Sequence, residues 1–427
     1  MNKILSRLRG QLANLWKKGA FYIIVGNFAT KFVTFFGSIV LAKHLLSKSD
    51  YGLLGYIENL YSFPAVFAGL GLSLSLLRYS ILSDKMGKKY AYYKFAVKWS
   101  FLFNVILAII MYVFNVFYKR SGFENANSLL FILILGLPFY QLTNDSLMNE
   151  RALFNNRNYA GFSFISATLI VIGKVIGAYS AEITGVILSV LFVNIFTGIF
   201  LLLFEKRKYF ANVDLIPLTR DEKGIAVKYG VQYMITNSLW AMFMLVDVFM
   251  IGRILQDKLL LADYKVAYVF PGNIAIISAA IAIFVTPYFV KNENDNAWIK
   301  RNYKKIFSVN ALVIGIIALI LYAVTPIIIK VCYGSQYMNV VSLMRLLLIP
   351  CFINCGLRVI TANALSAMGE VRYNLGISFV GLVLEIILDL LLIPNYGLIG
   401  VVIAASITYS IMTILLFIIF NKKYKII

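Results

Sequence analysis

Four cationic side chains stand inside long apolar blocks of the sequence: Lys31, Lys174, Arg345 and Arg358. A charged side chain at the middle of a bilayer costs about 3 kcal/mol or more, so such residues face a wet cavity or a partner. Arginine suits phosphate because its planar guanidinium bonds two oxygens at once. The four residues are therefore candidate ligands for an anionic substrate. Alternatively, each one pairs with a carboxylate and holds helices in register.

Acidic side chains also lie inside apolar blocks, and three of them are Asp247, Glu385 and Asp389. Glu385 and Asp389 are four positions apart, so they share one face of a helix. Two carboxylates on a buried face could carry a proton or Na⁺, or they could be neutralised by Lys or Arg. We treat all three as candidate ion-coupling residues.

Signals for catalysis and for bound metals are missing from the sequence. The chain has one histidine, His44, and an odd number of cysteines, Cys332, Cys351 and Cys355. These residues argue against a metal site and against a disulfide framework. Neither a phosphate-binding Gly-x4-Gly-Lys-Ser/Thr loop nor a Gly-x-Ser-x-Gly elbow occurs. We expect no catalytic residue, no metal and no cofactor beyond a coupling H⁺ or Na⁺, and therefore no enzyme.

The composition is that of a polytopic membrane protein. Of the 427 residues, 61% are hydrophobic and only 14% are charged, and the apolar residues form blocks of the roughly 20 residues that a membrane helix needs. We predict an all-α protein of about twelve transmembrane helices, near residues 20–42, 52–77, 97–117, 128–148, 160–179, 183–204, 225–252, 264–290, 306–329, 338–362, 374–393 and 397–420.

The net charge of +21 lies in the short connections between these blocks rather than in one patch. Such a distribution orients a membrane protein, whereas a nucleic-acid partner would favour one basic face. With the N-terminus inside, every inner connection contains Lys or Arg, and most contain several. The outer connections contain only Lys43, Lys48, Lys119, Arg120, Arg253, Lys258 and Lys330. We therefore expect both termini to be cytoplasmic.

The chain contains an internal repeat. Residues 157–209 align with 372–424 without a gap, which places Arg157 on Arg372, Gly161 on Gly376 and Gly185 on Gly400. Matches of Arg and Gly in one register are more informative than apolar matches, which membrane helices share by default. The repeat unit would contain six helices, so both halves would have the same orientation in the membrane.

These patterns divide the chain into five segments. We predict a basic amphipathic segment on the membrane surface at 1–19, rather than a cleaved signal peptide. A six-helix lobe at 20–210, a cytoplasmic linker at 211–224, a second six-helix lobe at 225–420 and a basic cytoplasmic tail at 421–427 follow.

Five short motifs resemble those of polysaccharide and oligosaccharide-lipid flippases of the O-antigen flippase type. This family belongs to the multidrug/oligosaccharidyl-lipid/polysaccharide exporter superfamily. The motifs are Asp50-Tyr51-Gly52, residues 246–252 (VDVFMIG), residues 333–337 (YGSQY), residues 363–369 (NALSAMG) and residues 394–400 (PNYGLIG). One departure is Lys265 after Asp263-Tyr264, where the pattern has a small residue.

The resemblance implies two six-helix lobes around a central cavity that is open alternately to the two sides. It also implies a bacterial cytoplasmic (inner) membrane protein that flips an undecaprenyl-diphosphate-linked oligosaccharide, such as an O-antigen, capsule or exopolysaccharide repeat unit, to the outer leaflet. A polysaccharide polymerase and glycosyltransferases would then be partners, with no role for nucleic acid. Lys31, Lys174, Arg345 and Arg358 would line the cavity and hold the diphosphate.

Two other functions remain open. A multidrug or organic-cation exporter of the same superfamily would have acidic groups and few cations in its cavity, whereas this chain has several buried cations. A membrane polysaccharide polymerase or ligase would need a sizeable outer loop, and no outer connection predicted here is long enough.

Overall fold

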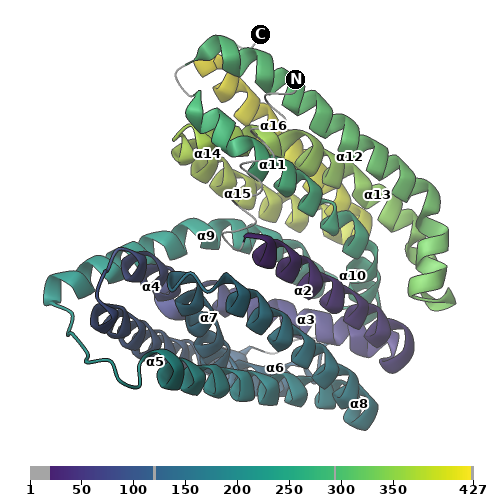
Figure 1. Cartoon of the computed structure of the whole chain (residues 1–427). Coiled ribbons are helices and arrows are strands. Elements are labelled where there is room, and N and C mark those ends of the chain that lie inside the picture. The colour runs from purple at the N-terminus through teal and green to yellow at the C-terminus, as the bar shows by residue number, and fades with distance from the viewer. Residues whose placement is uncertain (1–19, 119–121, 293–294, 425–427) are drawn as a thin grey trace. The chain divides into compact units, whose positions relative to one another are not determined.

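The structure is a computed structural model that describes residues 20–118, 122–292 and 295–424, and these residues form helices with no β-strand (Figure 1). The predicted all-α class is confirmed. The predicted surface segment 1–19 and residues 425–427 of the predicted tail lie outside the described residues.

The described residues form two compact units, and each is described by itself. The first contains the described parts of Met1–Ser47, Leu60–Lys119 and Glu124–Asn237. Its helices are α2 (Ala20–Val40), η1 (Leu41–Leu45), the end of α3 (Lys48–Val66), η2 (Ala68–Gly71), α4 (Leu72–Ile81), α5 (Met86–Phe117), α6 (Ala126–Ile134), α7 (Leu137–Ala152), α8 (Asn156–Tyr209) and the start of α9 (Arg220–Ile254).

The second unit contains Lys48–Asn59, the described part of Arg120–Phe123, and the described part of Ser238–Ile427. After the end of α9, its helices are α10 (Lys258–Asn273), α11 (Ala275–Lys291), α12 (Asn296–Cys332), η3 (Ser335–Val340), α13 (Val341–Cys351), η4 (Phe352–Arg358), α14 (Val359–Ala367), α15 (Val371–Tyr396) and α16 (Leu398–Tyr424). Two of the unit boundaries fall inside α3 and α9, whereas the sequence placed the boundary between the lobes at residues 211–224.

The helices account for about twelve membrane crossings. Among the described residues, ten helices are long and apolar enough to cross a membrane, and the bent pair Lys48–Val66 and Ala68–Ile81 adds an eleventh. α8 is one of the ten, but its 54 residues contain non-helical backbone at Ala181 and Glu182. At about 1.5 Å per residue its two halves are each long enough for a crossing. Counting them separately gives twelve.

The bend in the second crossing has a local cause. Gly69, Leu70 and Gly71 have φ values of 66°, 52° and 67°, which no helix can continue through. The backbone N–H of Gly69 donates to Oδ1 of the buried Asn104 at 3.0 Å. That bond satisfies a donor that the break frees, as a non-helical segment at membrane depth requires.

The internal repeat is visible in the helices themselves. The register that places Arg157 on Arg372 also places the start of α8, Asn156, on the start of α15, Val371. In the same register the break of α8 at Glu182 falls on Gly397, where α15 ends. In both repeats the second helix packs antiparallel on the first, with Gly185 against Gly177 and Gly400 against Leu392. The two repeats therefore contain the same helical hairpin, as the sequence register predicted.

Large apolar side chains are exposed over much of the surface. Phe117, Tyr179 and Leu319 are 82%, 87% and 71% exposed, and they belong to crossings of high hydropathy. Exposed apolar patches of this extent are unfavourable in water and are the normal surface of a protein in lipid.

Candidate functional site

The three predicted ion-coupling residues come together inside the second unit. One carboxylate oxygen from each of Asp247, Glu385 and Asp389 lies within 4.8 Å of the others. α9 supplies Asp247, and the i, i+4 spacing on α15 directs the other two to the same face. Glu385 and Asp389 are 1% and 0% exposed. We call these three residues the acidic cluster.

The acidic cluster is only partly satisfied by hydrogen bonds. The Tyr264 hydroxyl donates to Oδ2 of Asp247 at 2.8 Å. Within the described residues, neither oxygen of Glu385 nor of Asp389 has a hydrogen-bond partner. The hydroxyl of the fully buried Thr408 on α16 lies close to Glu385 and also lacks a partner. A buried polar atom without a hydrogen-bond partner costs about 1–3 kcal/mol, so this cluster of oxygen atoms favours a bound proton or cation.

Oxygen ligands of this kind define which ions could bind. Carboxylate and hydroxyl oxygens prefer hard cations, and carboxylates this close to one another repel unless a positive charge lies between them. Protons on the carboxylates or one Na⁺ would each relieve the repulsion. The set contains no nitrogen or sulfur ligand, so it does not resemble a zinc site.

Arg358 lies in the same unit and is 6% exposed. It ends the π-helical segment η4, and its Nε donates to Oδ1 of Asn354 at 2.8 Å. Its guanidinium carbon lies 4.6 Å from the ring centroid of Trp240 and 5.9 Å from that of Tyr409. Cation–π contacts stabilise a desolvated guanidinium by about 2 kcal/mol. Within the described residues Arg358 forms no salt bridge to a carboxylate, so the alternative prediction of a structural ion pair is not what the geometry shows there.

Arg358 and the acidic cluster both lie next to α16, at adjacent residues of that helix. Tyr409 contacts Arg358, and the preceding residue, Thr408, lies close to Glu385. None of the candidate site residues predicted from the sequence was Trp240, Tyr264, Thr408 or Tyr409. Thr408 and Tyr409 are polar residues in an apolar helix, and that signal could have identified them.

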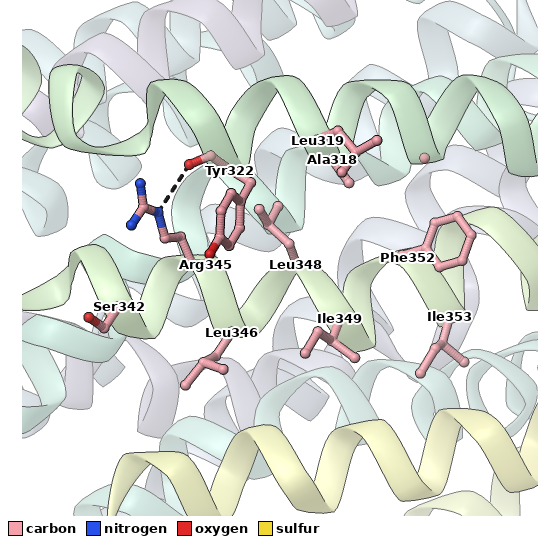
Figure 2. Close-up of a pocket in the computed structure, with 11 residues that line it drawn as sticks. Ala318, Leu319, Tyr322, Ser342, Arg345, Leu346, Leu348, Ile349, Phe352 and Ile353 are labelled. Carbon is pink, nitrogen blue, oxygen red and sulfur yellow. Dashed lines mark hydrogen bonds between the residues drawn. The ribbon is translucent and has the colours of Figure 1, made fainter.

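Arg345 lies elsewhere in the second unit, in a groove of about 630 Å³ between α12 and α13 (Figure 2). Its Nε donates to the backbone carbonyl of Tyr322 at 3.1 Å, and its guanidinium carbon lies 4.6 Å from the Tyr322 ring centroid. The structure therefore does not bring Arg345 into the environment of Arg358.

Lys31 and Lys174 belong to the first unit. Lys31 is exposed on α2, and Lys174 is half-buried on α8. The two helices pack against each other where Gly26 meets Ala160 and Gly37 meets Val171. A cavity that all four cations line stays a prediction.

Other charged side chains of the predicted crossings have polar or charged partners within their own unit. Asp145, which is fully buried, accepts hydrogen bonds from Ser73, Ser100 and Gln141. Lys265, the departure from the family pattern, lies 3.2 Å from a carboxylate oxygen of Glu58. This ion pair explains how a lysine is accommodated at that position.

The fold is that of known membrane transporters. A structure of the lipid II flippase MurJ in an inward closed conformation superposes with a TM-score of 0.73, at 17% identity, covering 93% of this chain and 87% of that one. An inward-facing multidrug resistance MATE transporter of the MOP superfamily gives 0.72, at 14% identity, with 93% and 94% covered. A MOP superfamily transporter from Pyrococcus furiosus gives 0.63, at 14% identity, with 94% of each chain covered. The chain therefore has the MOP transporter fold.

The family is defined by sequence. A family model described as polysaccharide biosynthesis protein matches residues 40–342, and the chain belongs to this family. The resemblance to polysaccharide flippases is thereby confirmed. A search of curated proteins gave no match.

Proposed function

We propose that the protein flips an undecaprenyl-diphosphate-linked oligosaccharide, such as an O-antigen, capsule or exopolysaccharide repeat unit. The direction is from the cytoplasmic to the outer leaflet of the bacterial cytoplasmic membrane, by alternating access. The observation that carries the proposal is the match to polysaccharide biosynthesis proteins over residues 40–342. A transporter fold in such a family supports movement of a saccharide intermediate rather than its synthesis.

Arg358 supports an anionic substrate. It is buried between Trp240 and Tyr409, and no carboxylate pairs with it among the described residues. A buried cation without a counter-charge is costly, and a phosphate would supply the missing charge. In this proposal the diphosphate is the group that the cationic residues recognise.

The acidic cluster supports ion coupling. A proton or Na⁺ bound at Asp247, Glu385 and Asp389 would neutralise carboxylates that repel one another at a separation of at most 4.8 Å. Binding and release of that ion would bias the conformational equilibrium of the transporter, provided that the ion has different affinities for its states. The ion gradient would then drive the flipping step.

A multidrug exporter is the second candidate. The MATE transporter structures share the fold at TM-scores up to 0.72, and an acidic cluster would suit a cationic drug. The two candidates differ in the effect of Arg358. Its charge would attract a lipid diphosphate and would repel an organic cation.

Complementation tests the proposal. In a flippase-deficient bacterial strain, expression of this protein should restore export of at least one defined lipid-linked repeat, and Arg358→Gln should abolish it at equal membrane abundance. The matched control is Arg372→Gln, which removes an arginine whose side chain is 74% exposed and should leave export unchanged. Resistance to cationic drugs without export of any repeat would support the multidrug exporter instead.

A further inference from the structure

The groove that holds Arg345 has one cationic end and a mostly apolar lining. Figure 2 shows Arg345 and Tyr322 together, with Leu346, Ile349, Phe352 and Ile353 following along α13 and η4. At about 630 Å³ it falls in the range of ligand sites, roughly 300–1,000 Å³. Leu319 and Ile349 are 71% and 51% exposed, so the groove is open along the surface of the unit.

The backbone of α12 explains how Arg345 is fixed. The carbonyl of Tyr322 would normally accept from the N–H four residues later, but that residue is Pro326, which has no N–H. Nε of Arg345 donates to this carbonyl instead. The bond holds the guanidinium in place and occupies only Nε. Among the described residues, neither η nitrogen has an acceptor, and no carboxylate forms a salt bridge with Arg345.

The first unit contains a matching groove without the cation. It lies between α5 and α6–α7, measures about 430 Å³, and has no charged residue in its lining. Phe131, Ile134 and Pro138 line it. The starts of α6 and α13, Ala126 and Val341, are also 215 positions apart, and extending the register of the repeat to them places these three residues on Leu346, Ile349 and Ile353 of the second groove. The position that corresponds to Arg345 is the buried Leu130. Lipid chains could cover either groove, but only the second has a cation for an anionic head group.

Arg345 is predicted to lie toward the outer side of the membrane. Tyr322 follows the last basic residue of the α12 N-terminal cluster, Lys305, by 17 positions. At about 1.5 Å per residue this is roughly 26 Å, against a hydrocarbon core of about 30 Å. In the orientation that the Lys and Arg distribution predicts, Arg345 therefore lies in the outer half of the membrane, and Gly315 and Ile353 lie deeper.

We infer that this groove binds a polyprenyl phosphate lipid, with the phosphate on the η nitrogens of Arg345 and the isoprenoid chain along Ile349 and Ile353. The inference rests on the proposed function, because flipping a lipid-linked oligosaccharide brings its polyprenyl chain and the attached phosphate to the outer leaflet. A single apolar chain with a multiply charged head complements one open groove with one guanidinium. The groove would hold the carrier lipid as it leaves the transporter.

The test is binding of undecaprenyl phosphate and of phosphatidylglycerol to the purified full-length protein, measured by native mass spectrometry. Arg345→Gln keeps an N–H donor for Tyr322 but removes the charge, and Ala318→Phe fills the groove. Each should weaken undecaprenyl phosphate binding by roughly tenfold or more. For Arg345→Gln this is the loss expected for one charge-assisted hydrogen bond; for Ala318→Phe it follows from exclusion of the lipid chain. Two controls should leave binding of undecaprenyl phosphate unchanged. Lys330→Gln changes a residue of α12 outside the groove, and Ala108→Phe fills the apolar groove of the first unit.

Three results would overturn the inference. Unchanged binding in Arg345→Gln would remove the role of the cation. Equal binding of both lipids would identify the occupant as a bilayer phospholipid. Equal losses of binding in Ala318→Phe and Ala108→Phe would show that the Arg345 groove is not the specific binding site. If Arg345→Gln binds undecaprenyl phosphate normally while the wild-type protein still exports a lipid-linked repeat, the groove inference fails and the proposed function stands. If groove variants lose binding but the wild-type protein exports no repeat, the proposed function fails.

Discussion

Glu182 and Gly397, which occupy equivalent positions in the internal repeat, have the same backbone conformation. Their φ, ψ angles are 49°, −135° and 56°, −134°. Each residue turns the chain between two antiparallel crossings, in a region of φ that favours glycine over residues with a Cβ. The sequence supplies glycine in the second repeat only, so Glu182 holds a strained backbone.

Replacing Glu182 by glycine should therefore stabilise the protein. Backbone strain of this kind costs about 1–3 kcal/mol, and the Glu182 side chain is exposed to the surroundings rather than packed in the unit. We expect Glu182→Gly to raise the midpoint of thermal unfolding in detergent, and Gly397→Ala to lower it. A lower midpoint for Glu182→Gly would show that the side chain stabilises the turn.

Gly185 and Gly400, which follow the two turns, should tolerate alanine less well than Gly161 and Gly376, which lie near the start of each hairpin. A Cβ at Gly185 or Gly400 would lie 2.0 Å or 2.5 Å from a carbonyl oxygen of the facing helix. A Cβ at Gly161 or Gly376 would meet nothing within 4 Å. Gly185→Ala and Gly400→Ala should each destabilise by about 1–3 kcal/mol through overpacking, whereas alanine at the other pair should be neutral or mildly stabilising. Thermal unfolding in one detergent would measure all four, and the reverse ranking would disprove the shared hairpin.

The sequence predicted the helix starts and turns of this hairpin because its two crossings are consecutive in the chain. Apolar blocks set the crossings, and the gapless register of the repeat matched helix starts at Asn156 and Val371 and turns at Glu182 and Gly397. The register could be read because both repeats bury glycine against a facing backbone. By contrast, the N-terminal surface segment is predicted from sequence alone.

The candidate site was only partly predictable. Helical spacing placed Glu385 and Asp389 on one face, but their approach to Asp247 depends on how α9 packs against α15, which no local pattern specifies. Arg345 was predicted to line the same cavity as Arg358, but it lies in a separate groove. Apolar side chains cover both the lipid-facing and the inward-facing sides of a membrane helix, so the sequence could not distinguish a groove from a cavity.

The acidic cluster should make stability depend on a cation. A ligand that binds only the folded state stabilises it, by about 2.7 kcal/mol at a hundredfold excess over its Kd. We expect Na⁺, compared with choline at equal ionic strength, or a lower pH, to raise the unfolding midpoint of the wild-type protein. Asp389→Asn should abolish the response, because it removes one of the converging carboxylates.

The control for this experiment is Glu222→Gln. Glu222 pairs with Lys88 at 2.6 Å in the first unit and is not part of the cluster. This variant should keep the cation response of the wild-type protein. A response that survives in Asp389→Asn, or that disappears in Glu222→Gln, would contradict ion binding at the cluster.

The orientation of the protein can be tested with single cysteines. The background would lack Cys332, Cys351 and Cys355, the last two of which are buried. Ser180→Cys lies in a predicted outer connection and Lys85→Cys in a predicted inner one, and both positions are exposed. A membrane-impermeant thiol reagent should label Ser180→Cys in intact cells, and Lys85→Cys only after permeabilisation. Labelling of Lys85→Cys in intact cells would reverse the predicted topology.

The central claim, flipping of a lipid-linked oligosaccharide, is tested most directly with purified protein in liposomes. The substrate would be an undecaprenyl-diphosphate oligosaccharide placed in one leaflet, and a lectin outside the vesicles would measure the exposed fraction over time. We expect the wild-type protein to move the sugar between leaflets and empty liposomes not to do so. Arg358→Gln should be strongly impaired when equal amounts of protein are reconstituted. If defined repeats stay in their leaflet while a fluorescent organic cation crosses the membrane, the protein is an exporter of cations and the account is wrong.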